Sequence, residues 1–299
     1  ASLSLSSCAN KTSYEKLMNI SSILKEGKEL LSKAGIYQPL RESKLIICYA
    51  LNINTENSFL DIENEITDLQ IKNIYSLFAR RAQGEPFSYL TESVLFFGLT
   101  FYINNQVLIP RPETEELVEI VLNRIKYKNK KYNILDLATG SGVILASLLT
   151  HLPKSFGIGT DISLNALKVS KININNLKLN NRTGLVNTNW SEGLKANNFD
   201  IIVCNPPYIS NKHIKNLHKE VKNYEPLLAL KGGPSGFESF ISLIPSARAM
   251  IKKTGLIVFE VGFDQAQIVK NILHKNKFTV IEIVKDLAGI ERILIAKPI

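Results

Sequence analysis

The fold is decided by one run, Ile134-Leu135-Asp136-Leu137-Ala138-Thr139-Gly140-Ser141-Gly142. Its first four residues are those of a short buried strand, and the small residues that follow lead into a stretch of helical type. Small residues let the backbone approach a ligand closely, and the amino terminus of a helix offers N–H groups to an anion. The run therefore predicts an α/β sheet that binds a ligand where a strand ends.

A second strand carries a carboxylate at its end. Gly159-Thr160-Asp161 lies about twenty residues beyond the loop, where a carboxylate can accept hydrogen bonds from both hydroxyls of a ribose. The loop itself has the spacing A-x-G-x-G, which is shorter than the dinucleotide fingerprint G-x-G-x-x-G. Asp161 would serve S-adenosylmethionine or NAD equally. These two segments predict a nucleoside cofactor and leave a methyltransferase and a dehydrogenase open.

The predicted strand 199–204 is followed by Asn205-Pro206-Pro207-Tyr208. Neither proline has an N–H to donate, so the pair ends the sheet ladder and holds the carbonyls of Asn205 and Pro206 at the end of the strand. An amide side chain beside a free carbonyl can accept both hydrogens of an –NH2 group, which orients a weakly nucleophilic nitrogen toward an electrophilic methyl group. Tyr208 supplies an aromatic wall for a planar target. Alone, the motif also suits a proline-rich turn; beside the glycine loop, it favours methyl transfer.

Strands and helices alternate beyond residue 109, which predicts a doubly wound, mainly parallel sheet. Only Lys285 to Ile290 joins the last two strands, and so short a connection permits antiparallel pairing but no parallel crossover. A seven-stranded, Rossmann-like sheet with its last strand reversed is typical of methyltransferases that use S-adenosylmethionine. The predicted strands are 133–137, 156–160, 184–187, 199–204, 255–261, 278–284 and 291–297.

The first third of the chain has apolar residues at helical spacing. The spacing predicts small helices over 14–34, 40–51 and 68–81, before Gly84-Glu85-Pro86 breaks the pattern. Residues 94–103 then predict a β-hairpin around Gly98, and Pro112 begins a helix that runs to about Ile125. We expect a helical domain over 1–84, a β-hairpin linker over 85–110 and an α/β domain over 111–299.

Charge and composition narrow the partners. Nearly all of the net charge of +9 lies beyond residue 84, in part in basic clusters over 124–131 and 212–222. The second cluster could line the rim of the site, which favours an acidic protein or a nucleic acid without choosing between them. The three cysteines and four histidines lack metal-ligand spacing, so no metal is expected. Without a membrane-length apolar run or a secretory signal, the chain is expected in the cytoplasm, with an organelle as the alternative.

Two further residues have both a functional and a purely structural interpretation. Trp190, the only tryptophan, follows the third predicted strand, a position that borders the adenine pocket in this architecture. Its ring could contact a base or pack in the core. Cys204 closes a core strand and is expected to be a small buried hydrophobe rather than a nucleophile.

With these pieces in place, the chain resembles the peptide chain release factor glutamine methyltransferases, the HemK/PrmC family. The resemblance extends from residue 84 to the carboxyl end, and the helical part before it agrees in size and position. Asn-Pro-Pro-Tyr alone is shared with adenine and cytosine amino-methyltransferases, but it is specific in combination. The runs that carry the resemblance are 84–86 (GEP), 89–91 (YLT), 108–115 (LIPRPETE), 136–142 (DLATGSG), 205–208 (NPPY), 224–227 (YEPL), 229–230 (AL) and 232–233 (GG).

The resemblance implies transfer of a methyl group from S-adenosyl-L-methionine to N5, the side-chain amide nitrogen of the glutamine in the Gly-Gly-Gln motif of class I release factors. The products would be N5-methylglutamine and S-adenosyl-L-homocysteine. The release factor would be the partner, free or on the ribosome, and the domain over 1–84 would grip it away from that motif. No nucleic-acid substrate and no membrane partner is expected.

The resemblance also assigns site residues. Asn205 to Tyr208 would grip the glutamine, with Asn205, Pro206 and Tyr208 catalytic. Ala138 stands where the family usually has its first glycine, and the additional methyl group is tolerated there if φ of this residue is below zero. Asn189 stands where an aspartate is common in the family. The implied cofactor contacts are Ala138, Thr139, Gly140, Ser141, Gly142, Asp161, Trp190 and Asn205; the implied substrate contacts are Asn205, Pro206, Pro207 and Tyr208.

A DNA or RNA adenine-N6 or cytosine-N4 methyltransferase is the strongest alternative, because those bases present the same –NH2 geometry. Acidic and basic residues nearly balance over 1–84, which suits a phosphate backbone poorly. A non-enzymatic, ribosome-associated binding module would leave the glycine loop, Asp161 and Asn205 unexplained. The sequence therefore favours the glutamine methyltransferase.

Overall fold

The structure, a computed structural model, describes residues 20–53 and 66–299. The chain divides into two compact units, Ala1–Phe87 and Ser88–Ile299. Part of the first predicted helix, 14–19, lies outside the described residues. The division of the chain into a recognition domain, a linker and a catalytic domain stays a prediction.

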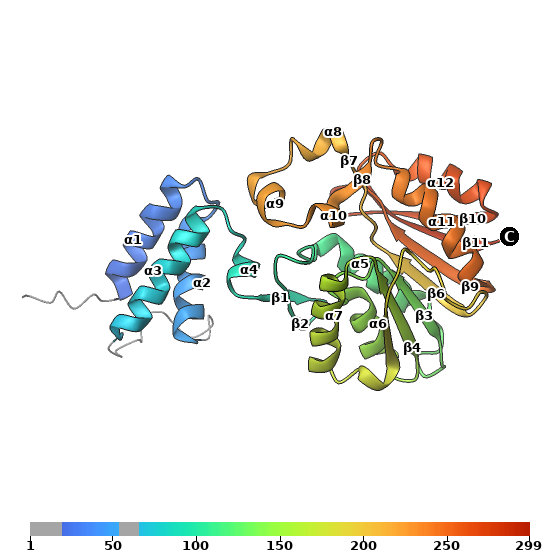
Figure 1. Cartoon of the computed structure of the whole chain (residues 1–299), viewed down its shortest axis with the longest axis horizontal. Coiled ribbons are helices and arrows are strands. Elements are labelled where there is room, and N and C mark those ends of the chain that lie inside the picture. The colour runs from blue at the N-terminus through green and yellow to red at the C-terminus, as the bar shows by residue number, and fades with distance from the viewer. Residues whose placement is uncertain (1–19, 54–65) are drawn as a thin grey trace, which may run out of the picture. The chain divides into compact units, whose positions relative to one another are not determined.

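The described part of the first unit contains helices α1 (Ile20–Lys33), α2 (Pro39–Leu51) and α3 (Asp68–Ala82), as Figure 1 shows. Gly35 follows α1 with a φ of 75°, and Asn52 ends α2 in the left-handed region. Thr67 begins α3 with a capping box, in which its hydroxyl accepts a hydrogen bond from the backbone of Gln70. The three predicted helices are thus confirmed over the described residues.

The helices of the first unit pack closely. Ile23, Leu31, Ile47 and Phe78 are fully buried. Gly27 on α1 allows this approach, because a Cβ there would lie 2.2 Å from Cζ of Phe78 on α3. The absence of a side chain at this helix position therefore has a packing reason.

The second unit begins with the short helix α4 (Phe87–Leu90, its first residue still in the first unit) and a hairpin. Strands β1 (Ser93–Phe96) and β2 (Leu99–Tyr102) pair antiparallel, with Phe96 opposite Leu99. The two residues between the strands, Phe97 and Gly98, both have positive φ, which a tight two-residue hairpin turn requires. The predicted hairpin is confirmed.

A seven-stranded sheet in the order β10-β11-β9-β6-β3-β4-β5 forms the core of the second unit. Only β11 runs against its neighbours, pairing antiparallel with both β9 and β10. The predicted fold class and the reversed last strand are confirmed. The strands are β3 (Asn133–Leu137), β4 (Phe156–Asp161), β5 (Thr183–Asn187), β6 (Phe199–Cys204), β9 (Ile251–Glu260), β10 (Phe278–Lys285) and β11 (Glu291–Pro298).

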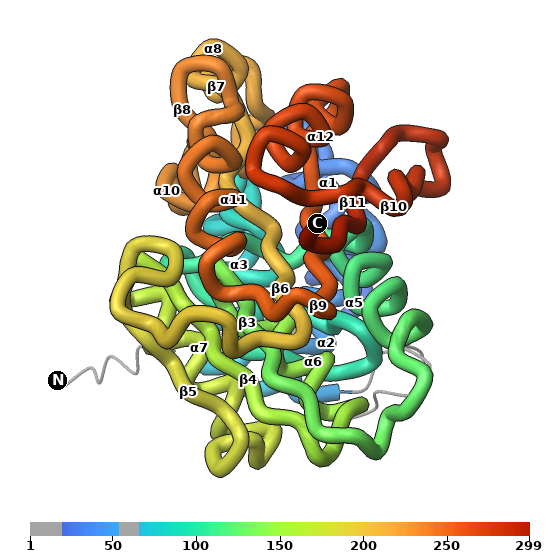
Figure 2. Tube along the Cα trace, turned by 90° about the vertical axis from the view of Figure 1, so that its right-hand side faces the viewer, coloured from blue at the N-terminus to red at the C-terminus, as the bar shows by residue number. Residues whose placement is uncertain are grey.

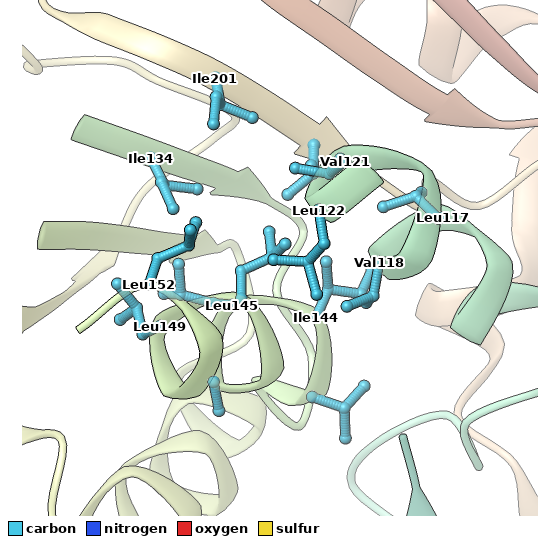
Figure 3. Close-up of a cluster of buried hydrophobic side chains, with 14 of the residues drawn as sticks. Leu117, Val118, Val121, Leu122, Ile134, Ile144, Leu145, Leu149, Leu152 and Ile201 are labelled. Carbon is cyan, nitrogen blue, oxygen red and sulfur yellow. The ribbon is translucent and has the colours of Figure 1, made fainter. Parts of the chain in front are cut away.

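Helices cover both faces of this sheet. Helices α5 (Pro112–Arg124), α6 (Val143–His151) and α7 (Leu164–Asn176) pack on one face, and α11 (Glu238–Met250) and α12 (Ala266–Lys275) on the other (Figures 1 and 2). Alternate residues of each strand face opposite sides of the sheet. Ile134 and Ile201 belong to the same core cluster as Leu145 of α6 (Figure 3), whereas Leu135 belongs to the core on the side of α11.

Between β6 and α11 the chain forms several short elements that local periodicity does not reveal. They are β7 (Ile209–Ser210), α8 (Asn211–Ile214), α9 (Lys219–Tyr224), α10 (Leu227–Leu230) and β8 (Lys231–Gly233), and β7 pairs parallel with β8. A one-turn 3-10 helix, η1 (Asn180–Arg182), precedes β5. Strand β9 also begins earlier than the predicted 255, because Ile251 already pairs with Phe199 of β6.

No helix in the described ranges is both long and apolar enough to cross a membrane. The expected cytoplasmic location stays a prediction.

We expect Gly27→Ala to destabilise the first unit. Alanine gains about 1 kcal/mol of helix propensity, but the contact with the buried Phe78 ring forces overpacking, for a net loss of about 1–2 kcal/mol. Hydrogen exchange of the α1 and α3 amides in the whole chain measures this loss. Ser32→Ala, at an exposed position of the same helix, is the control; equal protection in the two variants would contradict the packing argument.

Candidate functional site

A cavity of about 310 Å³ lies where β3, β4 and β6 end. It is lined by residues that come from all three strand ends and from the segments 106–110 and 226–231. Of the predicted site residues, it brings together Ala138, Thr139, Gly140, Ser141, Asp161, Trp190, Asn205 and Pro207. Gly142, Pro206 and Tyr208 are not among its lining residues.

The loop after β3 is held by backbone and side-chain contacts. Thr139 donates its backbone N–H to the carbonyl of Thr160 at 2.8 Å, which ties the loop to the end of β4. Gly142, at the start of α6, has a φ of 80°, and a Cβ there would lie 2.3 Å from Oγ of Ser170. At Gly140 a Cβ would meet no atom within 4 Å, so this backbone faces open space. Gly142 thus lets two helices approach, while Gly140 leaves room for a ligand.

Ala138 adopts a φ of 56°, in the left-handed region. The sequence predicts that alanine is tolerated at this position if φ is negative, and that condition is not met. A Cβ in this conformation crowds the following carbonyl, at a cost of roughly 1–2 kcal/mol. The residue is therefore strained where a glycine would not be.

Asp161 lies at the cavity with both carboxylate oxygens engaged by backbone. Oδ2 accepts the N–H of Gly140 at 2.9 Å, and Oδ1 accepts the N–H of Ser163 at 2.8 Å. Burial raises the pKa of Asp161, and these two hydrogen bonds oppose the rise. Each oxygen keeps a lone pair, so the carboxylate can still accept a bond from a ligand hydroxyl.

Asp136 lies directly beneath the loop and is fully buried. Thr139 donates its hydroxyl to Oδ2 at 2.6 Å, whereas Oδ1 has no hydrogen-bond partner among the described residues. Burial raises the pKa of Asp136 to about 7, against the effect of the Thr139 bond. The carboxylate anchors the loop at the cost of burying a charge.

Trp190 is half-buried and serves both the cavity and the core. Its Nε1 donates to Oγ of Ser242 on α11 at 3.0 Å, and its ring packs against the core on that face of the sheet. The ring also lines the cavity. Asn189, beside it, lines the cavity as well.

The segment after β6 is fixed by a network that the sequence does not reveal. Nδ2 of Asn205 donates to Oγ1 of Thr114 at 3.1 Å, and Thr114 donates to Oε2 of Glu260 at 2.7 Å. The hydroxyl of Tyr208 donates to Oε1 of the same glutamate at 3.3 Å. Thr114 lies in the first turn of α5, and Glu260 ends β9. Tyr208 thus supports the site from outside the cavity through its bond to Glu260, whereas the sequence predicts that its ring forms part of the cavity wall.

The backbone of this segment is clamped as well. Gln265 donates Nε2 to the carbonyl of Tyr208 at 2.9 Å and accepts the N–H of Gly262 at 2.9 Å. Gly232 lies against the same segment, because a Cβ there would be 2.7 Å from Cα of Tyr208. Pro206 is buried, and Pro207 faces the cavity.

A partly buried ion pair holds another part of the cavity wall. Arg111 donates Nη2 to Oε1 of Glu225 at 2.6 Å, and Glu225 also accepts the backbone N–H of Ile109 at 3.3 Å. The pair joins two runs that are far apart in sequence, and both contribute to the cavity wall through Pro110 and Pro226. The sequence shows an arginine in one run and a glutamate in the other, but it does not show that the two side chains form an ion pair.

The described residues contain no group of three or more histidine, cysteine or acidic side chains placed to hold a metal ion. The expectation that the site needs no metal stays a prediction.

Comparisons with known proteins point to one family. The family model described as PrmC N-terminal domain matches residues 22–91, and the one described as Methyltransferase small domain matches residues 114–227. The release factor glutamine methyltransferase of Caulobacter vibrioides is 36% identical over 268 residues, which cover 90% of this chain and 92% of that protein. Its counterpart in Thermodesulfovibrio yellowstonii is 40% identical over 259 residues, which cover 86% and 91%.

Two further likenesses are partial. A bifunctional methyltransferase of Rickettsia typhi is 33% identical over 298 residues, which cover 94% of this chain but 58% of that longer protein. Among solved structures, the hMettl16 catalytic domain in complex with the MAT2A 3′UTR hairpin 6 has a TM-score of 0.50 at 17% identity, covering 77% of this chain and 82% of that one. At that identity the likeness concerns the fold alone.

We expect Asp136→Asn to stabilise the protein at alkaline pH. The folded state raises the pKa of Asp136 from 3.8 to about 7, so the charge opposes folding fully above pH 7 and not at all below the unfolded value. The gain in melting temperature should be largest near pH 8 and fade as the pH falls from 7 toward 4. Asp264→Asn, at an exposed position, is the control. A gain that is independent of pH would contradict the assignment.

We expect Ala138→Gly to raise the free energy of unfolding by about 1 kcal/mol, because glycine adopts a positive φ without strain. Urea denaturation measures the change. The matched substitution Ala249→Gly, within helix α11, should have the opposite sign, with a loss of about 1 kcal/mol. If both substitutions destabilise equally, the backbone strain at Ala138 is not real.

Proposed function

The chain belongs to the family of release factor glutamine methyltransferases, and on that basis we propose that it methylates the side-chain amide nitrogen of the glutamine in the Gly-Gly-Gln motif of peptide chain release factors, with S-adenosylmethionine as the methyl donor. One observation carries the proposal for this chain. The amide of Asn205, the glycine loop and Asp161 line a single cavity. An acceptor for an –NH2 group thus lies beside features suited to a nucleoside.

The residues present fit S-adenosylmethionine. The cavity volume of about 310 Å³ is within the usual range for small ligands. Gly140 leaves open space above its backbone, and Asp161 lies at the end of the neighbouring strand, where a ribose can be held. We assign the cofactor to Ala138, Thr139, Gly140, Ser141, Asp161, Trp190 and Asn205, with Gly142 contributing through the start of α6. When bound, the cofactor supplies an electrophilic methyl group on a sulfonium.

Asn205 and Pro206 would then orient the substrate. An amide nitrogen is a poor nucleophile, because its lone pair is delocalised into the carbonyl. If Oδ1 of Asn205 and the carbonyl of Pro206 each accept one N–H of the substrate –NH2 group, the lone pair is turned toward the methyl group for an in-line displacement. The N–C bond would form as the methyl–sulfur bond breaks, and the nitrogen would lose one of its two hydrogens as a proton. Positioning and exclusion of water supply the rate, without a covalent enzyme intermediate. Pro207 and Tyr208 would hold the rest of the segment in place.

We also propose that the helical domain over 1–84 binds the release factor away from its Gly-Gly-Gln motif. The family model for the PrmC N-terminal domain matches residues 22–91, which supports a role that this domain shares with its relatives. Whether the release factor is free or on the ribosome does not alter the chemistry at Asn205.

The test is methyl transfer from radiolabelled S-adenosylmethionine to a recombinant release factor, beside the same factor with Gln→Ala in its Gly-Gly-Gln motif. Label on the unaltered factor alone supports the proposal and identifies the target residue. Asn205→Ala in the enzyme should lower turnover by roughly 10²-fold or more. If neither factor is labelled while the cofactor binds, the proposal fails, and label on an oligonucleotide would make the nucleic-acid alternative correct.

A further inference from the structure

The hydrogen bonds of Asn205 determine the orientation of its side-chain amide as well as its place in the cavity. Three side chains form a chain of hydrogen bonds from the cavity to the buried end of β9: Asn205, Thr114 and Glu260. Thr114 and Glu260 are 3% and 2% exposed, so water does not compete for their hydrogen bonds. The centre of the network is therefore shielded from water, and the network meets the cavity at Asn205 and Thr114.

The direction of each bond follows from counting hydrogens. A hydroxyl has one hydrogen to donate, and an ionised carboxylate can only accept. Thr114 therefore gives its hydrogen to Glu260 and offers Asn205 nothing but a lone pair. Only the nitrogen of the amide, Nδ2, can donate to that lone pair. The two ends of an asparagine side chain, which geometry alone distinguishes poorly, are thus told apart by the network.

This orientation decides which atom of the Asn205 amide is available to the substrate. With Nδ2 held by Thr114, Oδ1 lies on the other side of the amide as the acceptor. In the reverse orientation the amide would present two donors to a substrate –NH2 group, which itself has only hydrogens to offer. Such a site would repel the substrate it has to orient.

We propose that Glu260, acting through the hydroxyl of Thr114, is a positioning residue that sets the amide orientation of Asn205 for methyl transfer. The proposal rests on the proposed function in one respect, namely that Oδ1 of Asn205 accepts a hydrogen of the substrate. The orientation of the amide itself does not depend on the identity of the substrate.

The groups around Glu260 give the network a pH dependence. Burial raises the pKa of Glu260 to about 6, helped by Glu113 and opposed by the bonds from Thr114 and Tyr208 and by Arg292. Above that pH the carboxylate only accepts. Below it, the protonated acid can donate to Thr114, whose own hydrogen is then free to face Asn205 and favour the reverse orientation. Activity should therefore fall as the pH drops through about 6.

The first test compares Thr114→Val with Thr114→Ser. Valine has the shape of threonine but no hydroxyl, and serine restores the hydroxyl. Thr114→Val should lower kcat for release factor methylation on the order of 10- to 100-fold, while KM for S-adenosylmethionine stays within about twofold. Thr114→Ser should recover most of kcat. Thr279→Val, at an exposed position on the edge strand β10, is the control for the substitution itself.

Glu260→Gln is the second test. Its side-chain amide can donate to Thr114, so kcat should fall as in Thr114→Val, and the decline of activity below pH 6 should vanish. Normal kcat in Thr114→Val or Glu260→Gln, with an unchanged melting temperature, would overturn the proposal. A parallel loss of kcat, cofactor affinity and melting temperature, which serine does not rescue, would show a merely structural role and also overturn it.

A measurement that needs no turnover separates this inference from the proposed function. In ¹⁵N NMR spectra, the Asn205 side-chain amide should have one hydrogen protected from exchange with water in the unaltered protein and in Thr114→Ser. The protection should be lost in Thr114→Val. If the unaltered enzyme fails to methylate release factors but shows this pattern, the proposed function is wrong and the positioning role stands. Equal exchange in all three proteins would overturn the positioning role.

Discussion

The second unit is organised around the abrupt end of strand β6. This strand lies between β3 and β9, inside the sheet, and its ladder stops after Cys204 because Pro206 and Pro207 have no N–H to continue it. The chain must leave the sheet at this point, over the ends of both neighbours. Asn205 therefore reaches α5 on one side, and Tyr208 reaches the end of β9. This departure of the chain from the sheet places Asn205 and Pro207 at the cavity and Tyr208 against Glu260. It also leads into the short elements over 209–233.

Much of this architecture could be predicted from local patterns. Strands that are buried on both faces are nearly continuous apolar runs, as in Phe199 to Val203, and helices such as α5 begin at a well-placed proline, Pro112. The loop 138–142 and Asp161 could be predicted to share a site, because the carboxyl ends of parallel neighbours meet at one edge of a sheet. The hairpin was equally clear, since Gly98 marks its turn.

The rest could not be predicted, for physical reasons. Thr114 and Glu260 are 146 residues apart, and no local signal says that a first-turn threonine will meet a glutamate at the end of β9. The backbone conformation of Ala138 is set by the tight turn between β3 and α6, which overrides the preference of an alanine for negative φ. Elements such as β7 and α10 are too short for periodicity to appear, and β7 is defined by its pairing with β8, which lies about twenty residues further along the chain.

Strand β11 has a consequence for how the protein is assembled. It fills the gap between β9 and β10, although it follows both along the chain, and Ile293 pairs with Glu260. During synthesis the backbone groups on this edge of β9 therefore stay unpaired until β11 has emerged from the ribosome. The surroundings of Glu260 are completed in the same step, since Val261 donates its N–H to the carbonyl of Arg292. A nascent chain that has already formed its cofactor loop would still lack part of the environment that holds Asn205, so that cofactor binding and catalytic competence would be acquired at different times.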